Sequence, residues 1–144
     1  DFDALPKAGS ALGTGAIVVM DEDTCMVDVA RRTARFFAHE SCGRCVPCRV
    51  GSQRTLEALT RITDGRGAPA DIAALDALAE GIGGKTFCPM GDAQVGPLMS
   101  SLRLFRDEYE AHVAGGGCRI HDPAAAAAAP ASKGPRIRTA RASG

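Results

Sequence analysis

Cys42-Gly43-Arg44-Cys45-Val46-Pro47-Cys48 places three cysteines at two-residue gaps, and Phe87-Cys88-Pro89 adds a fourth far downstream. A tight loop with this spacing can direct three thiolates at one point, while a distant segment folds back with a fourth ligand and closes a tetrahedral shell. The spacing therefore predicts a metal centre, and the group that fits it best is a [4Fe–4S] cluster held by the four cysteines Cys42, Cys45, Cys48 and Cys88.

A structural zinc ion is the alternative, because four thiolates also satisfy its preference for closed tetrahedral sulfur coordination. Such zinc sites usually draw their ligands from two separated pairs, whereas three ligands within seven residues and a distant fourth are typical of iron–sulfur proteins. A redox-active dithiol fits less well, since there is a third cysteine and no surrounding βαβ pattern. A zinc-stapled helical interaction module remains open.

Composition limits the class of protein. The chain has 144 residues, with 17 acidic and 17 basic side chains, so it is not built as a whole to bind nucleic acid. Six cysteines without a signal-like segment favour metal binding over a disulfide framework. No apolar run approaches the roughly 20 residues of a membrane-spanning helix, so we expect no direct membrane insertion. The chain begins without methionine, and we expect it to be a piece of a larger protein.

Helical periodicity covers most of the middle of the chain. Four amphipathic helices are expected, beginning near Asp23, Pro47, Pro69 and Asp92. The last shows apolar side chains at steps of three and four, namely Val95, Leu98, Leu102, Phe105 and Tyr109. The fold class predicted is mainly α, a small four-helix bundle over residues 23–113 that carries the cluster.

The flanking segments differ in character from the bundle. Residues 11–21 form a glycine-flanked apolar run that suits a short buried strand, so residues 1–22 are expected to end an upstream β domain. Residues 114–144 are expected to form a flexible, alanine-rich basic tail, disordered from about residue 122.

Several side chains outside the four cysteines could carry chemistry. Cys25 is expected to be a small buried thiol and Cys118 a surface thiol. His39 and Glu40 are interpreted as helix-end and hydrogen-bonding groups, because no nucleophile completes a catalytic set; no catalytic residue is predicted. His112 and His121 are expected to be exposed. Burial behind Phe36, Phe37 and Phe87 is expected to shield the cluster.

The segment around the first three cysteines resembles a known family. Glu40-Ser41-Cys42-Gly43-Arg44-Cys45-Val46-Pro47-Cys48-Arg49-Val50-Gly51 is similar, position by position, to the signature of the flavoprotein NADH-binding subunit of respiratory complex I. Subunits of NAD-reducing hydrogenases and NAD-dependent formate dehydrogenases carry similar segments. The resemblance extends to residues 12–21, 84–88 and 105–109, and covers roughly residues 10–113.

This resemblance implies a [4Fe–4S] cluster that takes electrons from a flavin mononucleotide (FMN), reduced by NADH, and passes them to iron–sulfur clusters in partner subunits. It also implies that FMN and NADH bind to a domain upstream of this sequence and that residues 1–22 end a β-grasp domain. This chain alone should then be inactive. The same module in a soluble formate dehydrogenase or hydrogenase diaphorase subunit is the alternative. The implied location is cytoplasmic, peripheral on a bacterial inner membrane through partner subunits.

Overall fold

The computed structural model describes residues 2–118 and residue 120. It divides into two compact units, one containing residues 2–22 and the other beginning at Asp23. The second unit contains the bundle. Five helices make it up: α2 (Met26–Glu40), α3 (Val46–Thr63), α4 (Pro69–Ile82), α5 (Met90–Leu104) and α6 (Arg106–Gly115). The prediction of a mainly α fold is confirmed.

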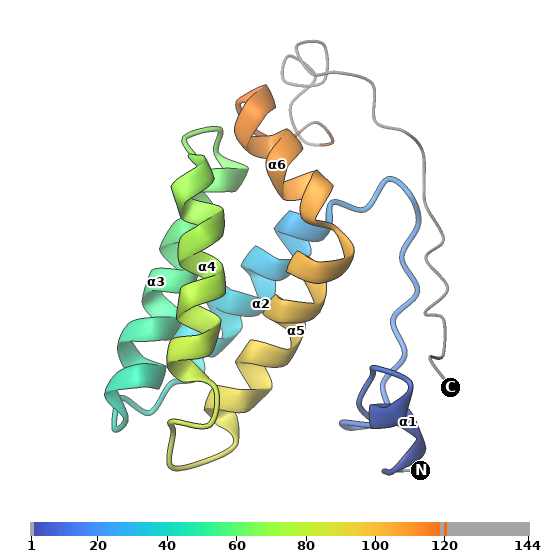
Figure 1. The fold of residues 1–144 in the computed structure, drawn as a ribbon, viewed down its shortest axis with the longest axis vertical. Helices are drawn as coiled ribbons and strands as arrows, with labels where there is room; N and C mark the ends of the chain where they lie inside the picture. Colours follow the sequence, from blue (N-terminus) through green and yellow to red (C-terminus); the bar gives the residue numbers. More distant parts are fainter. Residues whose placement is uncertain (1, 119, 121–144) are drawn as a thin grey trace. The chain divides into compact units, whose positions relative to one another are not determined.

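The helices pack as neighbours along the sequence. Figure 1 shows α3 and α4 side by side, with α2 and α5 against them and α6 near one end. Three of the four expected helix starts are close to the observed ones. Pro47 lies in the first turn of α3 and Pro69 begins α4, where a missing N–H costs nothing. The cap of α2 is Cys25, whose sulfur accepts the Asp28 N–H, rather than Asp23 or Thr24.

Apolar side chains from all five helices form one core. The predicted faces supply most of it, including Leu59 and Ile62 from α3 and Leu75 from α4, each with no exposed surface. Tyr109 of α6 is also fully buried, and its hydroxyl lies 2.7 Å from the Ser101 hydroxyl of α5. This pairing satisfies a polar group that the apolar surroundings would otherwise penalise.

The prediction of one continuous fourth helix is wrong. The chain leaves helical geometry at Phe105, with φ −128° and ψ 29°, so α5 and α6 are separate helices. Phe105 is 37% exposed and does not belong to the core stripe. The break turns α6 so that it contacts α2, α3 and α4 as well as α5.

Residues 2–22 contain one short helix, α1 (Ala4–Lys7), and otherwise lack regular structure. The expected buried strand over residues 11–21 is not formed, and the described residues contain no β-strand with which it could pair. Ile17, Val18 and Val19 are 74–91% exposed. The assignment of residues 1–22 to a β-grasp domain remains a prediction.

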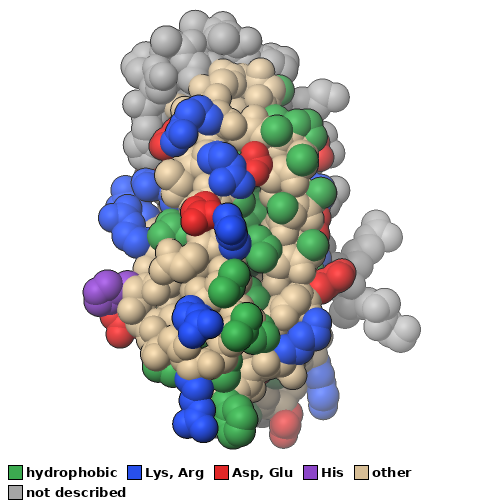
Figure 2. All heavy atoms as spheres, turned by 90° about the vertical axis from the view of Figure 1, so that its left-hand side faces the viewer, with side chains coloured by type: hydrophobic (Ala, Val, Ile, Leu, Met, Phe, Trp, Pro, Cys, Tyr) green, Lys and Arg blue, Asp and Glu red, His purple; other side chains and the backbone are tan. Residues whose placement is uncertain are grey.

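The expected disordered tail and the predicted exposure of His121 lie outside the described residues. Within the described part of the chain, no helix combines the length and the apolar character that crossing a membrane requires. Figure 2 looks onto the side of the molecule where α3 and α4 lie, and basic, acidic and hydrophobic side chains are interspersed there. That face offers no continuous field of one charge.

Candidate metal centre

The four predicted ligands lie in or next to two loops at one end of the bundle. Cys42 and Cys45 belong to the α2–α3 loop, Cys48 lies in the first turn of α3, and Cys88 lies in the α4–α5 loop. Figure 1 shows both loops at the lower end of the bundle. Cys48 is buried and Cys45 partly buried, whereas Cys42 and Cys88 are exposed. The two segments that are distant in sequence therefore meet in space.

One hydrogen bond to a sulfur atom connects the two loops, and another connects α5 to α3. The Phe87 N–H donates to Cys45 Sγ at 3.4 Å, and the side-chain amide of Gln94 donates to Cys48 Sγ at 3.7 Å. The Ser41 hydroxyl also lies 3.4 Å from Cys48 Sγ. Donors directed at sulfur suit thiolates that hold a metal or an iron–sulfur cluster, because they stabilise the negative charge. The residues present therefore fit such a group.

Local backbone geometry explains how the loops turn. Gly43 has φ +80°, a conformation that other residues rarely adopt. Gly91 is packed so closely against the Thr86 side chain that a methyl group there would overlap it. Thr86 in turn donates to the Cys88 carbonyl at 2.9 Å. Asp92, expected as the cap of α5, instead lies in its first turn and accepts the Gly84 N–H at 2.7 Å.

The nearby cations are partly engaged in holding the loops. Arg49 donates to the Gly43 carbonyl at 2.9 Å, and Lys85 donates to the Glu80 carbonyl at 2.6 Å. The Arg44 guanidinium lies 5.3 Å from the centre of the Phe87 ring, within cation–π range. Arg49 and Lys85 thus restrain the backbone as well as adding positive charge near the sulfur atoms.

The expected aromatic shield is not formed. Phe87 is 87% exposed and Phe36 is 57% exposed, although Phe36 packs edge-on against the partly buried Phe37. The reason is that Phe36 lies on the outer face of α2, away from its buried stripe. His39 and Glu40 pair with each other on the surface, with Nδ1 2.8 Å from Oε1.

A second group of chemically capable side chains was missed by sequence reasoning. Cys25, His112 and Cys118 are buried together, and one ligand atom from each lies within 4.8 Å of the others. The predictions that His112 is exposed and that Cys118 is a surface thiol are therefore wrong. Cys25 is buried as expected. The short spacing between His112 and Cys118 could have suggested a pair of metal ligands, but nothing in the sequence linked this pair to Cys25.

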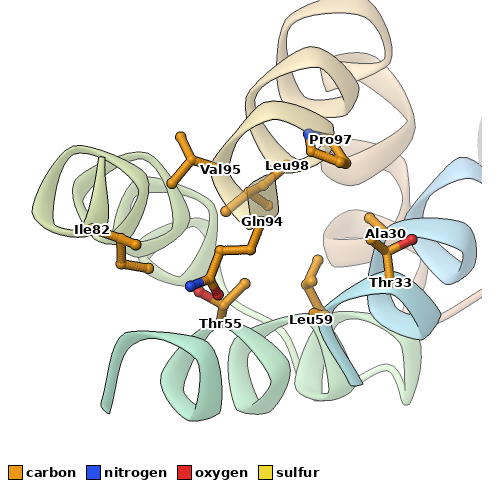
Figure 3. A pocket seen from close by; sticks show the side chains of 10 residues that line it. Ala30, Thr33, Thr55, Leu59, Ile82, Gln94, Val95, Pro97 and Leu98 are labelled. Atoms are coloured by element: carbon orange, nitrogen blue, oxygen red, sulfur yellow. The ribbon is translucent and has the colours of Figure 1, made fainter. Parts of the chain in front are cut away.

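A small pocket between α2, α3, α4 and α5 adjoins the cysteine end of the core. Figure 3 shows Gln94 and Thr55 facing each other there, with Ile82 and Leu59 among the apolar side chains around them. The Thr55 hydroxyl is buried without a hydrogen-bond partner. This leaves a polar atom close to the amide that donates to Cys48.

A helical bundle that gathers four cysteines at one end has the arrangement of a small α-helical metal-binding domain. Residues 28–112, more than half of the chain, match the family described as the NADH-ubiquinone oxidoreductase-F iron-sulfur binding region. The chain belongs to this family. It is thus an iron–sulfur binding region of the kind found in NADH dehydrogenases, which are oxidoreductases.

Individual relatives agree with this assignment. The chain is 45% identical over 124 residues to an NADH-quinone oxidoreductase subunit of Streptomyces coelicolor, covering 86% of this chain and 27% of that one. It is 44% identical over 121 residues to NADP-reducing hydrogenase subunit HndC of Solidesulfovibrio fructosivorans, covering 84% and 25%. The chain therefore spans about a quarter of the length of these relatives.

A solved structure shares the fold. The crystal structure of NAD+-reducing [NiFe]-hydrogenase in the H2-reduced state matches with a TM-score of 0.63 and 34% sequence identity. The match covers 66% of this chain and 17% of the hydrogenase chain. Similar chains thus occur both in NADH-quinone oxidoreductases and in hydrogenases.

Proposed function

We propose that this chain is the electron-transfer module of an NADH dehydrogenase flavoprotein subunit, with Cys42, Cys45, Cys48 and Cys88 as the ligands of a [4Fe–4S] cluster. The observation that carries the proposal is the hydrogen bond from the Phe87 N–H to Cys45 Sγ. It joins the segment of the fourth cysteine to the loop of the first three, which is the approach that a closed set of four thiolates requires.

When bound, such a cluster supplies one-electron transfer, and here it would accept electrons from FMN and deliver them to clusters of partner subunits. The chain itself supplies ligands, insulation and charge. Gln94 and the Phe87 N–H donate to sulfur, and Arg44, Arg49 and Lys85 add positive charge nearby. Both effects favour the reduced, more negative state. FMN and NADH would bind to a separate domain.

The exposed end of the bundle is where partners would approach. Val46 is 58% exposed and Phe87 is 87% exposed, and both adjoin cysteines. At the lower end in Figure 2, hydrophobic and basic side chains lie next to one another. We infer that other NADH dehydrogenase subunits or domains cover this end, exclude water from the sulfur atoms and hold the chain at the cytoplasmic side of a bacterial inner membrane.

The test is ligand replacement in the full chain after anaerobic reconstitution. The unaltered chain should hold about four iron and four sulfide ions. Cys88→Ser should lose or convert the cluster, with loss of its visible absorption and of its electron paramagnetic resonance signal in the reduced state. Cys25→Ser, which replaces a cysteine in another part of the fold, is the matched control and should keep both signals.

Equal loss of iron in the two variants would refute the assignment of Cys88. Stoichiometric zinc at the four cysteines with no iron after reconstitution would instead support the alternative of a zinc-stapled interaction module. A colourless protein would show this directly, since an iron–sulfur cluster absorbs broadly in the visible range.

A hydrogenase diaphorase subunit is the second candidate, favoured by the 44% identity to HndC and the 34% identity to the hydrogenase structure. The two candidates differ in the assembly that holds the chain. The complex isolated from its native source should reduce a quinone with NADH in the first case and reduce a nicotinamide cofactor with H2 in the second. A soluble formate dehydrogenase would use formate instead.

A further inference from the structure

Three buried ligand groups meet at the junction of α2 and α6. Cys25, His112 and Cys118 are 3%, 3% and 4% exposed, and one sulfur or nitrogen ligand atom from each lies within 4.8 Å of the other two. Cys25 Sγ is 3.3 Å from His112 Nε2. Two sulfurs and one imidazole nitrogen are a common donor set for zinc in proteins.

The histidine ring is oriented as in a metal ligand. Its Nδ1 lies 2.8 Å from the Glu108 carbonyl oxygen, one turn earlier in α6. This contact assigns the proton to Nδ1, because a carbonyl can only accept, and leaves the Nε2 lone pair directed at Cys25. A backbone carbonyl that fixes the ring in this way is the usual arrangement around zinc-bound histidine.

Each sulfur is positioned by the backbone. Cys25 is the N-cap of α2, and its sulfur accepts the Asp28 N–H at 3.3 Å, so the helix terminus stabilises a thiolate there. Cys118 is brought back by Gly116, which has φ +73°, while Gly117 donates to the His112 carbonyl at 2.9 Å. The chain thus turns sharply after α6 and returns its last cysteine to the group.

The charge of the surroundings also points to a cation. Glu108 accepts the Met26 N–H at 3.0 Å and interacts with Cys25. Two buried thiols beside a partly buried carboxyl are costly as anions unless positive charge is present.

We propose that Cys25, His112 and Cys118 form a zinc site that fastens α6 to the start of α2. Binding replaces the two thiol protons by two zinc–sulfur bonds and releases both protons to solvent. Thiolate and imidazole ligands select zinc over magnesium or calcium. The site would be structural, because all three ligands are enclosed.

This site is independent of the four loop cysteines and of the function proposed for them. Cys25 precedes α2 and Cys42 follows it, so the 15-residue helix separates the two places. At a rise of 1.5 Å per residue the separation is about 22 Å. One can therefore be removed without touching the ligands of the other.

The experiment uses the full chain, prepared with zinc and then reconstituted with iron and sulfide under anaerobic conditions. Metal analysis should find about one zinc ion per chain in addition to iron. The X-ray absorption spectrum at the zinc edge should show sulfur neighbours at about 2.3 Å together with nitrogen or oxygen neighbours at about 2.0–2.1 Å. Cys118→Ser should weaken zinc binding at least tenfold against a chromophoric chelator, with unchanged iron content.

Cys88→Ser is the matched control and should lose iron while retaining zinc. Cys118→His tests the geometry without removing a ligand: it should retain zinc, with one sulfur neighbour fewer. Absence of zinc from the folded chain would overturn the proposal. So would a four-sulfur zinc signal that disappears in Cys88→Ser, or a Cys25–Cys118 disulfide found by mass spectrometry in the chain prepared without oxidant.

Discussion

Gln94 shows how a single residue can connect the core to the candidate cluster site. It is only 8% exposed, projects from α5 and donates its side-chain amide to Cys48 Sγ. Its other neighbour in the pocket is Thr55, whose hydroxyl has no partner. A buried amide in such surroundings is held in one orientation, so its dipole acts steadily on the sulfur.

Gln94→Leu should lower the reduction potential of the reconstituted cluster, because the lost N–H···S contact stabilises the more negative reduced state. A hydrogen bond is worth about 1 kcal/mol, which corresponds to about 40 mV for a one-electron couple. Potentiometric titration followed by electron paramagnetic resonance measures this shift. Gln53→Leu is the control, since Gln53 donates to the Ala38 carbonyl and not to sulfur. An unchanged reduction potential in Gln94→Leu would contradict the role of the Gln94 amide in stabilising the reduced cluster.

At the scale of elements, α3 and α4 approach each other closely at one glycine. A methyl group added to Gly51 of α3 would lie 2.6 Å from Cδ1 and Cγ1 of Ile82, which is 1% exposed and has little room to move. The glycine therefore sets the distance between the two helices. Since Gly51 follows the cysteine segment in the same helix, this contact also bears on the position of the loop.

Gly51→Ala should destabilise the fold by about 1–3 kcal/mol through overpacking, despite the better helix propensity of alanine. Gly81→Ala should have the opposite effect on stability. Gly81 lies in α4 with nothing within 4 Å of the added methyl, so this variant should gain about 0.5–1 kcal/mol. Urea denaturation of both variants measures the difference. Equal stability would show that α3 and α4 adjust freely.

The start of α4 is held by one carboxylate. Asp71 accepts from Arg61 at 3.0 Å and 2.6 Å and from the Ala68 N–H at 2.9 Å. The hydrogen bond from Arg61 is the main reason why the pKa of Asp71 lies below its ordinary value. The Asp71 carboxylate thus binds a proton less readily in the folded state than in the unfolded state. Its contribution to the free energy of unfolding is therefore complete above the pKa of the unfolded state, and it disappears as pH falls through the pKa of the folded state.

Asp71→Asn should therefore cost about 1 kcal/mol at pH 7, from loss of the ion pair and weakening of the cap. The difference from the unaltered chain should shrink below about pH 4, where the carboxyl of the unaltered chain is protonated as well. Denaturation at a series of pH values tests this. A difference that stays constant down to pH 2 would contradict the role of the charge.

Sequence periodicity predicted α3 and α4 well, because proline at each start and a regular apolar face left little alternative. It did not predict the break at Phe105, where an apolar residue continues the pattern but the backbone turns. The spacing of Cys42, Cys45, Cys48 and Cys88, rather than periodicity, predicted that these four cysteines form one site. It could not predict the group at Cys25, whose members come together only through the direction that α6 takes after that break.

At the scale of the whole molecule, the described residues from Asp23 onward form a bundle, and a small pocket between its helices is lined by side chains such as Leu59, Ile82 and Leu98. We therefore expect the isolated chain, once reconstituted, to accept electrons from dithionite but not from NADH. Visible absorption under anaerobic conditions measures both. Bleaching by NADH alone would show that the chain binds the nicotinamide without a further domain, contrary to this prediction.

The start of α2 lies against the last turn of α6 and the segment that follows it, as the contact of Cys25 with His112 and its grouping with Cys118 show. The chain thus enters and leaves the bundle at one place, while the cysteine loops lie at the other end of α2. A unit with adjacent ends can be inserted into different longer polypeptides without pulling apart the segments on either side. This gives a physical reason why similar bundles occur both in NADH-quinone oxidoreductases and in hydrogenases.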